Sequence, residues 1–527
     1  MLKLPVPSTD SLQDVKVLIA NRGEIAVRVA RACRELGLGS VAVYSDCDRE
    51  SLHVRVADEA YPIGPPPARE SYLDIEKLLD VARRSGATLV HPGYGFLAEN
   101  AGFSQACRDA GLTFVGPTPE AIRLMGSKTA ARDAAIAAGV PVVPGTEKPF
   151  AADAPDALIM SEGDRIGFPL LVKAVAGGGG KGMRSVASRD ELLAAVRTAG
   201  SEAASAFGDA AVFLERLVVR PRHIEVQLMG DNFGTVIPFV ERECSIQRRH
   251  QKVVEESPST RVSDKTRKAM AECAAAVARS VGYTNAGTIE FLLDHSDGDE
   301  TFYFLEMNTR LQVEHPVTEM VTGIDLVHWQ LRVALGEKLT IDPARALTPR
   351  GHAIECRIIA EDPDQGFMPS PGRLVGLRVP QGPGVRDDGG VAEGFDIPIF
   401  YDSLIAKLVV WGESREIAIG RLRRALHEYQ VRGVRTTLPF FRWLTEQPEF
   451  ETAEFHTAWL DGVLASRNGE PFAVVSDADV QLAVIAAAAH AYTIARVPQA
   501  AGPPGASNLT SSNWQRAARI GSLRGDD

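Results

Sequence analysis

Two glutamates stand in neighbouring β-like segments, GTIEFLLD at 287–294 and TFYFLEMN at 301–308, which flank the polar turn HSDGDE. If these segments pair antiparallel about Gly298, Glu290 lies directly opposite Glu306, with the Cβ atoms about 4.5–5.5 Å apart. Two like charges at that separation repel each other unless a cation bridges them. Mg²⁺ suits the position, because such a hard ion is held by few carboxylates together with substrate phosphates.

Asn308 follows Glu306 by two residues, so it lies on the same face of the strand and could add an oxygen ligand. The apolar neighbours of the two glutamates fall on the opposite face: Ile289, Phe291, Leu305 and Met307. This alternation predicts a divalent-metal site. It also fits a solvated pair of glutamates on an exposed face.

A run of glycines follows an apolar segment that contains a lone lysine, in FPLLVKAVAGGGGKGM at 168–183. Backbone N–H groups approach phosphates closely only where side chains are missing, so this run suits a phosphate-binding loop. Lys173 would then direct a positive charge at a phosphate. The alternative is a mobile linker beside a lysine whose ammonium reaches solvent. The run matches neither GxxxxGK[ST] nor GxGxxG, which disfavours a P-loop or a dinucleotide site.

Two further segments combine charges that suit a small anion. The sequence QRRHQK at 247–252 holds four potentially cationic residues in five positions, within a chain whose formal net charge is -11. An anion site and a surface charge run fit this segment about equally well. In NTRLQVE at 308–314, Arg310 could bind an anion that Glu314 deprotonates, although a structural ion pair fits as well.

A phosphate loop, an acidic pair for a metal and cations beside a general base together describe one site that activates a substrate with ATP. The elements that position it are mixed. A strand at 15–20, a helix at 24–36 and a strand at 41–44 form a βαβ unit, which predicts an open parallel α/β domain near the N-terminus. After Arg222 the chain turns to long β segments with intervening helices, so the predicted fold class is α/β with a mixed α+β part.

The composition is that of a globular protein that does not bind nucleic acid. The chain has 527 residues, too many for one ordinary core. The net charge of -11 argues against a nucleic-acid binder. Six cysteines without a CxxC pair indicate reduced thiols. Because no signal peptide is apparent and the longest uncharged apolar stretch, 482–495, is shorter than a membrane helix, we expect a cytoplasmic protein.

Seven segments together resemble the motifs of the biotin carboxylase family, part of the ATP-grasp superfamily. They are NRGEIA at 21–26, HPGYGFLAEN at 91–100, MGSK at 125–128, GGGGKGM at 177–183, RRHQKVVEE at 248–256, EMNTRLQVEHP at 306–316 and GHAIECR at 351–357. The resemblance runs from about Val15 to Gly462. The domains that we expect from it are an N-terminal α/β domain at 1–126, a linker and ATP-grasp lid at 127–217, a C-terminal mixed-sheet domain at 218–468, and an extension at 469–527.

The resemblance also implies a role for individual residues. The residues that resemble ATP contacts are Lys128, Lys173, Gly177, Gly178, Gly179, Gly180, Glu215, Val218, His223, Gln247, His250 and Leu292. Those that resemble ligands of Mg²⁺ (or Mn²⁺) are Glu290, Glu306 and Asn308. The bicarbonate site comprises Lys252, Arg310, Gln312, Val313 and Glu314, with Glu314 as the general base. Arg386, in GVR at 384–386, resembles the arginine that binds biotin and stabilises its enolate.

The implied activity is the carboxylation of biotin with ATP and bicarbonate through carboxyphosphate, as the first half-reaction of an acyl-CoA carboxylase. Alternatives are the corresponding subunit of a pyruvate carboxylase, another ATP-grasp ligase, and a non-catalytic nucleotide-binding subunit. The Ala/Val-Met-Lys-Met tetrapeptide of biotin carriers does not occur in the chain, so we expect biotin on a separate carrier protein or domain.

The expected partners are that carrier and a carboxyltransferase subunit, and related carboxylases often form homodimers. The extension after Gly469 combines an Ala-rich helical stretch at 476–496 with Trp514 among arginines, residue types that are enriched at interfaces. We expect it to dock a partner, and a disordered terminus is the alternative.

Overall fold

A five-stranded parallel sheet forms first along the chain, with the strand order β3-β2-β1-β4-β5. The structure is a computed structural model that describes residues 14–175, 183–295, 298–473 and 477–496. Helices cover the sheet, and the apolar runs of its central strands are buried, which confirms the predicted open α/β fold. Its elements are β1 (Lys16–Ile19), α1 (Gly23–Glu35), β2 (Gly39–Ser45), α2 (Leu52–Val56), β3 (Glu59–Gly64), α3 (Ile75–Ser85), β4 (Leu89–His91), α4 (Ala101–Asp109) and β5 (Thr113–Phe114).

A small antiparallel sheet follows, in the order β6-β9-β7-β8, after the helices α5 (Pro119–Gly126) and α6 (Lys128–Ala137). Alternate residues of β7 and β9, such as Leu170 and Val212, pack with α7 and α8 in a core of their own. The elements are β6 (Phe150–Ala151), α7 (Asp156–Ile166), β7 (Leu170–Ala174), β8 (Met183–Val186), α8 (Leu192–Phe207) and β9 (Ala211–Arg216). The glycine run predicted to bind phosphate, 177–180, lies outside the described residues.

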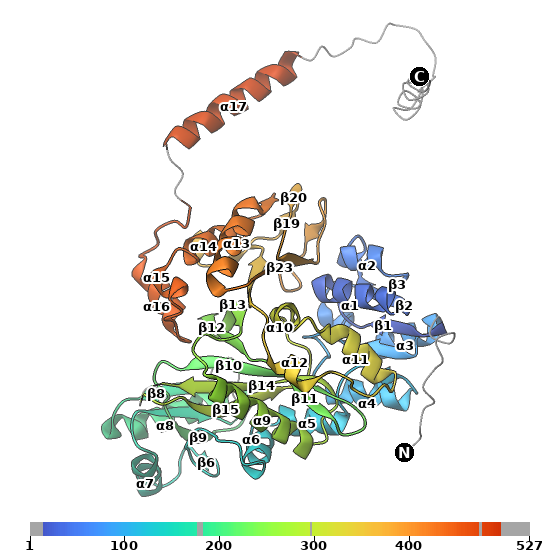
Figure 1. Ribbon diagram of the computed structural model, residues 1–527. Helices are drawn as coiled ribbons and strands as arrows, with labels where there is room; N and C mark the ends of the chain where they lie inside the picture. The colour runs from blue at the N-terminus through green and yellow to red at the C-terminus, as the bar shows by residue number, and fades with distance from the viewer. Residues whose placement is uncertain (1–13, 176–182, 296–297, 474–476, 497–527) are drawn as a thin grey trace. The chain divides into compact units, whose positions relative to one another are not determined.

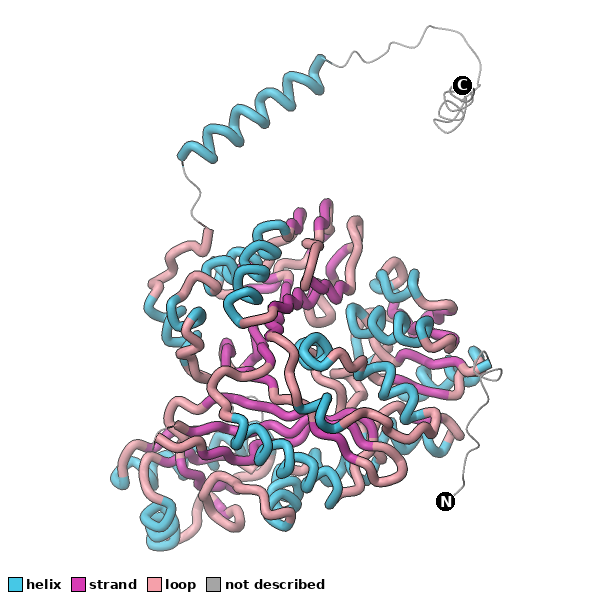
Figure 2. Tube along the Cα trace, in the orientation of Figure 1, coloured by secondary structure: helices cyan, strands magenta, loops and turns pink. Residues whose placement is uncertain are grey.

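The third sheet has nine strands, eight of them in the order β15-β14-β10-β12-β13-β16-β23-β21, with β11 paired to β10. Its strands pair antiparallel. Figure 2 draws the strands in magenta. They are β10 (Arg222–Gly230), β11 (Val236–Pro238), β12 (Arg242–Arg248), β13 (Gln251–Ser257), β14 (Asn285–Asp294), β15 (Thr301–Asn308), β16 (His352–Ile359), β21 (Val385–Gly389) and β23 (Leu404–Gly412).

Helices and short hairpins complete this part of the chain. The helices are α9 (Asp264–Ser280), α10 (His315–Thr322), α11 (Leu326–Ala334), α12 (Pro343–Leu347), α13 (Arg415–Glu428), α14 (Leu438–Leu444), α15 (Pro448–Glu451) and α16 (Trp459–Ser466). The short strands form pairs: β17 (Glu361–Asp362) with β18 (Met368–Pro369), β19 (Gly372–Arg373) with β22 (Asp396–Ile397), and β20 (Gly376–Arg378) with β24 (Gln430–Arg432). Figure 1 shows α11 beside α1, so the third sheet's helices pack on the first layer.

Strand β10 shows why polar residues gather inside the large sheet. Its odd and even positions face opposite sides, as the pleat requires. Ile224, Val226 and Leu228 join the apolar core that includes residues of α9. The alternating residues His223, Glu225 and Gln227 are also buried, so their polar groups must find partners within the protein.

The register of β14 and β15 confirms that Glu290 lies opposite Glu306. The route to that pairing differs from a uniform hairpin. Near the turn the pairs run from Asp294–Thr301 to Phe291–Phe304, and a bulge at Leu305 then shifts the register by one residue. The expectation that Leu305 shares the apolar face was wrong, because Leu305 is the bulged residue and lines the cavity.

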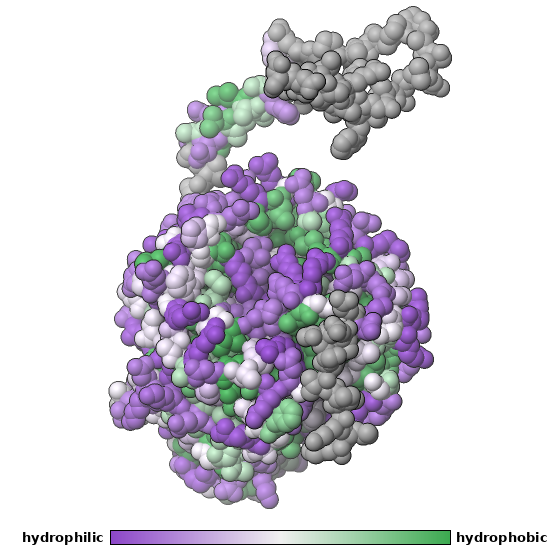
Figure 3. Space-filling view, turned by 45° about the vertical axis from the view of Figure 1, so that its right-hand side comes forward, coloured by the Kyte–Doolittle hydropathy of each residue, from purple (hydrophilic) through white to green (hydrophobic). Residues whose placement is uncertain are grey.

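The chain divides into two compact units, residues 1–472 and residues 473–527. The first unit contains all of the sheets described above, and the domain boundaries expected within it stay a prediction. In the second unit the structure describes α17 (Asp477–Arg496), whose residues 477–492 are all exposed. Figure 3 shows hydrophobic and hydrophilic atoms along this helix. Among the described residues, no helix is long and apolar enough to cross a membrane.

Candidate active site

A cavity of about 640 Å³ is lined by residues of the small sheet and the large sheet together. The lining brings together residues that the sequence places up to 329 positions apart, from Lys128 to Thr457. The predicted site residues in this lining are Lys128, Lys173, Glu215, Val218, His223, Gln247, His250, Lys252, Glu290, Leu292, Glu306, Asn308, Arg310, Gln312 and Val313. Their shared cavity supports the prediction of one site, while their individual roles stay predictions.

One part of the cavity wall is apolar and suits a flat organic group. Val143, Val218 and Tyr303 form a buried cluster against which Leu292 packs. The polar groups of His223 and Gln247 lie in the same lining, with Gln247 Nε2 2.8 Å from His223 Nδ1. An apolar wall with a few placed polar groups is typical of small-molecule sites.

The basic side of the cavity carries Lys128 and Lys173. Lys173 forms an ion pair with Glu215 across β7 and β9. The ion pair with Glu215 therefore helps to hold the side chain of Lys173 at the cavity wall. Two cations on one wall are suited to an anionic ligand such as a phosphate chain.

The acidic pair has an asymmetric environment. The carboxylate of Glu290 accepts hydrogen bonds from Lys252 Nζ at 2.8 Å and from Asn308 Nδ2 at 2.9 Å. His223 Nε2 lies 2.9 Å from the same carboxylate. Although burial opposes ionisation, Lys252 and His223 hold the pKa of Glu290 well below its usual range. For Glu306, desolvation by its surroundings and then the charge of Glu290 raise the pKa.

The residues of this pair fit a divalent metal ion. Glu290, Glu306 and Asn308 all line the cavity and offer hard oxygen donors from two paired strands. Burial and then the charge of Glu290 raise the pKa of Glu306, and a divalent cation bound by both carboxylates would lower it again.

Lys252 contacts both the acidic pair, through Glu290, and the predicted general base, Glu314. Its ammonium contacts Glu225 at 2.6 Å, Glu290 at 2.8 Å and Glu314 at 2.7 Å. Burial disfavours the charged lysine, but these three carboxylates raise its pKa well above the usual value. Lys252 is therefore a permanent cation at the wall of the cavity.

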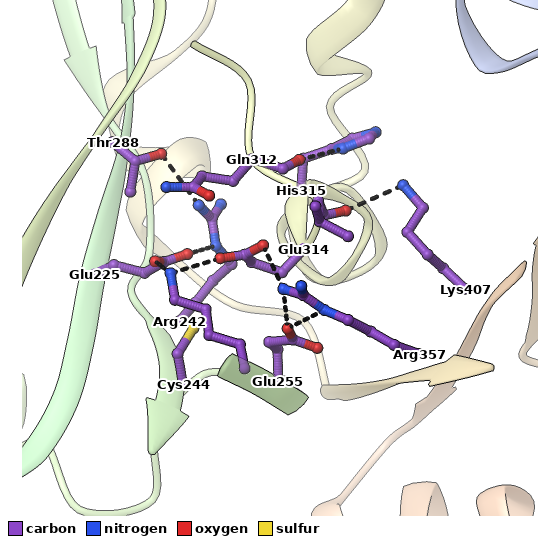
Figure 4. A network of polar contacts seen from close by, with 12 residues as sticks. Glu225, Arg242, Cys244, Glu255, Thr288, Gln312, Glu314, His315, Arg357 and Lys407 are labelled. Atoms are coloured by element: carbon purple, nitrogen blue, oxygen red, sulfur yellow. Dashed lines mark hydrogen bonds and ion pairs between the residues drawn. The ribbon is translucent and has the colours of Figure 1, made fainter. Parts of the chain in front are cut away.

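Glu314 is fully buried at the start of α10, beside the cavity rather than in its lining. It accepts a hydrogen bond from Lys252 Nζ at 2.7 Å. It accepts a second from Arg357 Nη2 at 3.1 Å, which Figure 4 shows. Burial alone would raise its pKa, but Lys252, Arg357 and Arg242 hold the pKa of Glu314 well below the ordinary value. The group is a carboxylate at neutral pH and can accept a proton.

The loop before α10 carries the residues that are predicted to bind bicarbonate. Arg310 Nε donates to Glu99 at 2.9 Å, and Arg310 Nη1 donates to Gln312 Oε1 at 3.1 Å. The carbonyl of Val313 accepts a hydrogen bond from the buried Lys407 at 3.0 Å. These contacts fix the backbone on which the predicted bicarbonate residues stand.

Arg386 is not among the described residues that line this cavity. Its guanidinium donates to Glu319 at 2.7 Å and to both carboxylate oxygens of Asp388 at 2.7 and 2.9 Å. Its role in binding biotin stays a prediction.

Arg357 is one of four arginines in the part of the cavity lining that the structure describes, and it contacts Glu314. The motif GHAIECR at 351–357 contains it, yet the sequence analysis assigned it no role. Alternation was the available signal, since Glu355 and Arg357 are charged residues within a strand whose other residues are mostly apolar. Glu225 and Glu99 were missed as well, and no spacing marked them.

The cavity and the three sheets place the chain in the class of ATP-grasp enzymes. Residues 127–342 match the ATP-binding domain of the carbamoyl-phosphate synthase L chain. Residues 13–122 match the N-terminal domain of biotin carboxylase, and residues 355–462 match its C-terminal domain. The chain belongs to the biotin carboxylase family, and it is an ATP-dependent carboxylase of the ligase class.

Several relatives agree with this family. The chain is 50% identical over 445 residues to a biotin carboxylase of Nostoc sp., covering 84% of this chain and 98% of the relative. It is 52% identical to a pyruvate carboxylase subunit of Methanothermobacter thermautotrophicus, covering 85% and 89%. It is 48% identical to the mitochondrial methylcrotonoyl-CoA carboxylase alpha subunit of Mus musculus, of which it covers 61% while 84% of this chain is matched.

Solved structures show the same fold. The biotin carboxylase of Campylobacter jejuni superposes with a TM-score of 0.79 at 43% identity, over 85% of this chain and 98% of that one. The biotin carboxylase domain dimer of the 2-oxoglutarate carboxylase from Hydrogenobacter thermophilus, in complex with MgADP, ADP and bicarbonate, gives 0.79 at 43% identity over 88% and 99%.

Proposed function

We propose that the cavity carboxylates biotin borne on a separate carrier, with ATP and bicarbonate as co-substrates, as the first half-reaction of an acyl-CoA carboxylase. The observation that carries the proposal is the union, in one cavity, of cations for a phosphate chain, an acidic pair and the Lys252–Glu314–Arg357 cluster. Each of these parts serves a different step of the reaction.

The first step joins bicarbonate to the γ-phosphorus of ATP. Bicarbonate binds beside Lys252 and Arg310, and Glu314 takes its proton. The bicarbonate oxygen attacks the γ-phosphorus, the bond to ADP breaks, and carboxyphosphate forms. Because an ammonium holds Glu314 at 2.7 Å, an arriving anion that attracts Lys252 would loosen this contact and strengthen the base.

The second step transfers the carboxyl group. Carboxyphosphate separates into CO₂ and phosphate, the phosphate takes the N1 proton of biotin, and the resulting enolate attacks CO₂. We assign the stabilisation of this anion to Arg386, as the family resemblance implies, and Arg357 adds a further positive charge at the cavity wall beside Glu314. A fixed charge aimed at developing negative charge is among the strongest catalytic effects.

Glu290, Glu306 and Asn308 would hold Mg²⁺ or Mn²⁺. The ion, when bound, neutralises charge on the ATP phosphates. Residues 127–217 would cover the cavity and exclude water from carboxyphosphate, which hydrolyses readily.

The carrier and a carboxyltransferase are the partners that this half-reaction requires. The methylcrotonoyl-CoA carboxylase relatives favour an acyl-CoA as the final acceptor. Pyruvate is the second candidate, because a pyruvate carboxylase subunit is 52% identical to this chain. Adding acetyl-CoA, propionyl-CoA, methylcrotonoyl-CoA or pyruvate to the complex isolated with its partners, and measuring fixation of labelled bicarbonate, separates these acceptors.

The activity itself is tested with the purified chain, ATP, Mg²⁺, bicarbonate and free biotin. We expect ADP release that needs bicarbonate and rises with biotin, and Glu314→Gln should abolish the bicarbonate-dependent part. ADP release that ignores bicarbonate would instead indicate another ATP-grasp ligase.

A further inference from the structure

Arg132 lines the cavity, yet the reaction described above assigns it no role. It follows Lys128 by four positions on α6, and residues at this spacing share one face of a helix, so both side chains reach the cavity. The guanidinium Nη2 of Arg132 donates to the carbonyl of Val143 at 2.9 Å. This hydrogen bond anchors the arginine at the cavity wall.

The carboxylate of Glu215 is shared between two cations. Its Oε2 forms the ion pair with Lys173, and its Oε1 lies 3.8 Å from Arg132 Nη1. The second distance is that of an ion pair but is longer than a hydrogen bond, so the guanidinium can still move closer to the carboxylate. Each carboxylate oxygen therefore has a cation of its own.

The backbone around Glu215 fixes the place of this carboxylate. Glu215 pairs with Leu171 of β7 and also forms a bridge with Gly145. A Cβ atom at Gly145 would lie 3.0 Å from the Cγ of Glu215, so the stem of this side chain packs directly on the Gly145 backbone. The carboxylate is thus held beside the cavity by the chain itself.

A carboxylate in this position opposes the binding of an anion. Lys173 and Glu215 together carry no net charge, so this pair alone would not attract the phosphate chain of ATP. With Arg132 included, the three groups carry a net positive charge. Their side chains are 26% exposed for Lys173, 21% for Arg132 and 17% for Glu215, so solvent screens these charges less than those of surface residues.

We propose that Arg132 is a positioning residue for the nucleotide, which balances the charge of Glu215 and thereby leaves the ammonium of Lys173 to the phosphate chain. When a phosphate draws Lys173 away from Glu215, Arg132 closes the 3.8 Å gap and remains as the partner of the carboxylate. The inference rests on the ATP site of the proposed function and adds to it a residue that acts through Glu215.

The experiment measures kcat and the KM for ATP in the full chain, with bicarbonate and free biotin at fixed, high concentrations. We expect Arg132→Gln to raise the KM for ATP about tenfold, the order of effect that local charge has on a charged substrate, and to leave kcat nearly unchanged. Arg132→Lys, which keeps the charge, should lie closer to wild type than Arg132→Gln.

Arg123→Gln is the matched control. Arg123 is exposed on the neighbouring helix α5 and is not among the described residues of the cavity lining. Its loss changes the net charge of the chain as much as the loss of Arg132 does. The KM for ATP of this variant should therefore equal that of wild type.

A second substitution separates the charge of Arg132 from its hydrogen bond to Val143. If Arg132 balances Glu215, then Glu215→Gln in the Arg132→Gln background removes the unbalanced carboxylate, and the KM for ATP should fall most of the way back to the wild-type value. If Arg132 only holds the backbone at Val143, the double variant should be no better than the single one. Thermal melts verify that each variant is folded.

A wild-type KM in Arg132→Gln, the same loss in Arg123→Gln, or a double variant as poor as Arg132→Gln would overturn the inference. Calorimetric binding of ADP gives the same comparison without turnover. If the wild-type chain binds ADP but shows no bicarbonate-dependent ATP cleavage, the proposed function fails, while the binding data still decide the role of Arg132. The two failures are therefore distinguishable.

Discussion

At the scale of residues, the site is a set of charges that cannot all be satisfied by the protein alone. Lys252 forms ion pairs with three carboxylates, and Arg357 forms ion pairs with two. Glu306 is left with a raised pKa. Buried charge that awaits a partner is typical of a functional site.

Removing the charge of Glu306 tests the metal assignment. We expect Glu306→Gln to abolish Mg²⁺-dependent ATP cleavage without lowering the melting temperature of the ligand-free protein, because the substitution removes a repulsion with Glu290. ATPase rates are measured over a Mg²⁺ titration beside thermal melts. Wild-type turnover at limiting Mg²⁺ would contradict the assignment.

Alanine substitution of two arginines tests which of them meets the biotin anion. We expect Arg386→Ala to slow biotin carboxylation by about 3 kcal/mol, or roughly a hundredfold, more than it slows bicarbonate-dependent ATP cleavage, as the family resemblance implies. Arg386→Ala and Arg357→Ala should both lower the melting temperature, because each leaves two buried carboxylates without their guanidinium. The ratio of carboxybiotin to ADP is the readout, and an altered ratio in Arg357→Ala alone would assign the role to Arg357 instead.

At the scale of elements, the layers meet through a buried contact between α1 and β23. Lys407 Nζ lies 3.2 Å from Glu24 and also donates to the carbonyl of Val313, so one lysine joins the first layer to the catalytic loop. Gly390 packs so closely on α1 that a Cβ atom there would lie 2.4 Å from Glu24 N. A larger residue at 390 has no room.

Glu24 predicts a pH dependence of stability. Burial raises its pKa to about 7, only partly offset by Lys407, whereas an unfolded glutamate titrates near 4.5. The folded state is therefore favoured at low pH, and that stability is lost as the pH rises through about 7. We expect wild type to lose about 2 kcal/mol between pH 5 and pH 7 relative to Glu24→Gln, measured by urea unfolding. Parallel curves for the two proteins would refute this.

Elements that the local sequence pattern determines could be predicted, and features that tertiary packing determines could not. The βαβ unit and the pairing of Glu290 with Glu306 follow from period and mirror symmetry, and both are present. The bulge at Leu305 has no local signal, because tertiary packing decides which residue leaves the ladder.

The local sequence pattern also could not show whether Arg357 or Arg386 lines the cavity. Both are arginines in β-strands, and only the three-dimensional structure shows which one reaches the cavity.

At the scale of the whole molecule, the division after Phe472 sets where the catalytic unit ends. The domain boundary expected from sequence lies between residues 468 and 469, four residues before this division. Phe472 belongs to the first unit, because its ring packs on Trp443 and Phe440 and its N–H donates to Asp364 at 2.9 Å.

Two truncations test the role of the extension. A chain ending at residue 472 should keep free-biotin carboxylation near the wild-type level and lose co-purification with the carrier and carboxyltransferase. A chain ending at residue 469 should melt at a lower temperature, since it loses the Phe472 contacts. Continued assembly of the 1–472 chain with its partners would place the docking surface in the first unit.

The central claim is that ATP activates bicarbonate within this cavity, and the oxygen atoms of bicarbonate report on it directly. With bicarbonate labelled by ¹⁸O at all three oxygens, attack on the γ-phosphorus leaves one labelled oxygen in each phosphate released. We predict singly labelled phosphate in step with ADP, and none from Glu314→Gln. Unlabelled phosphate from the wild-type chain, at the same rate of ATP cleavage, would mean that water rather than bicarbonate attacks ATP, and the account would be contradicted.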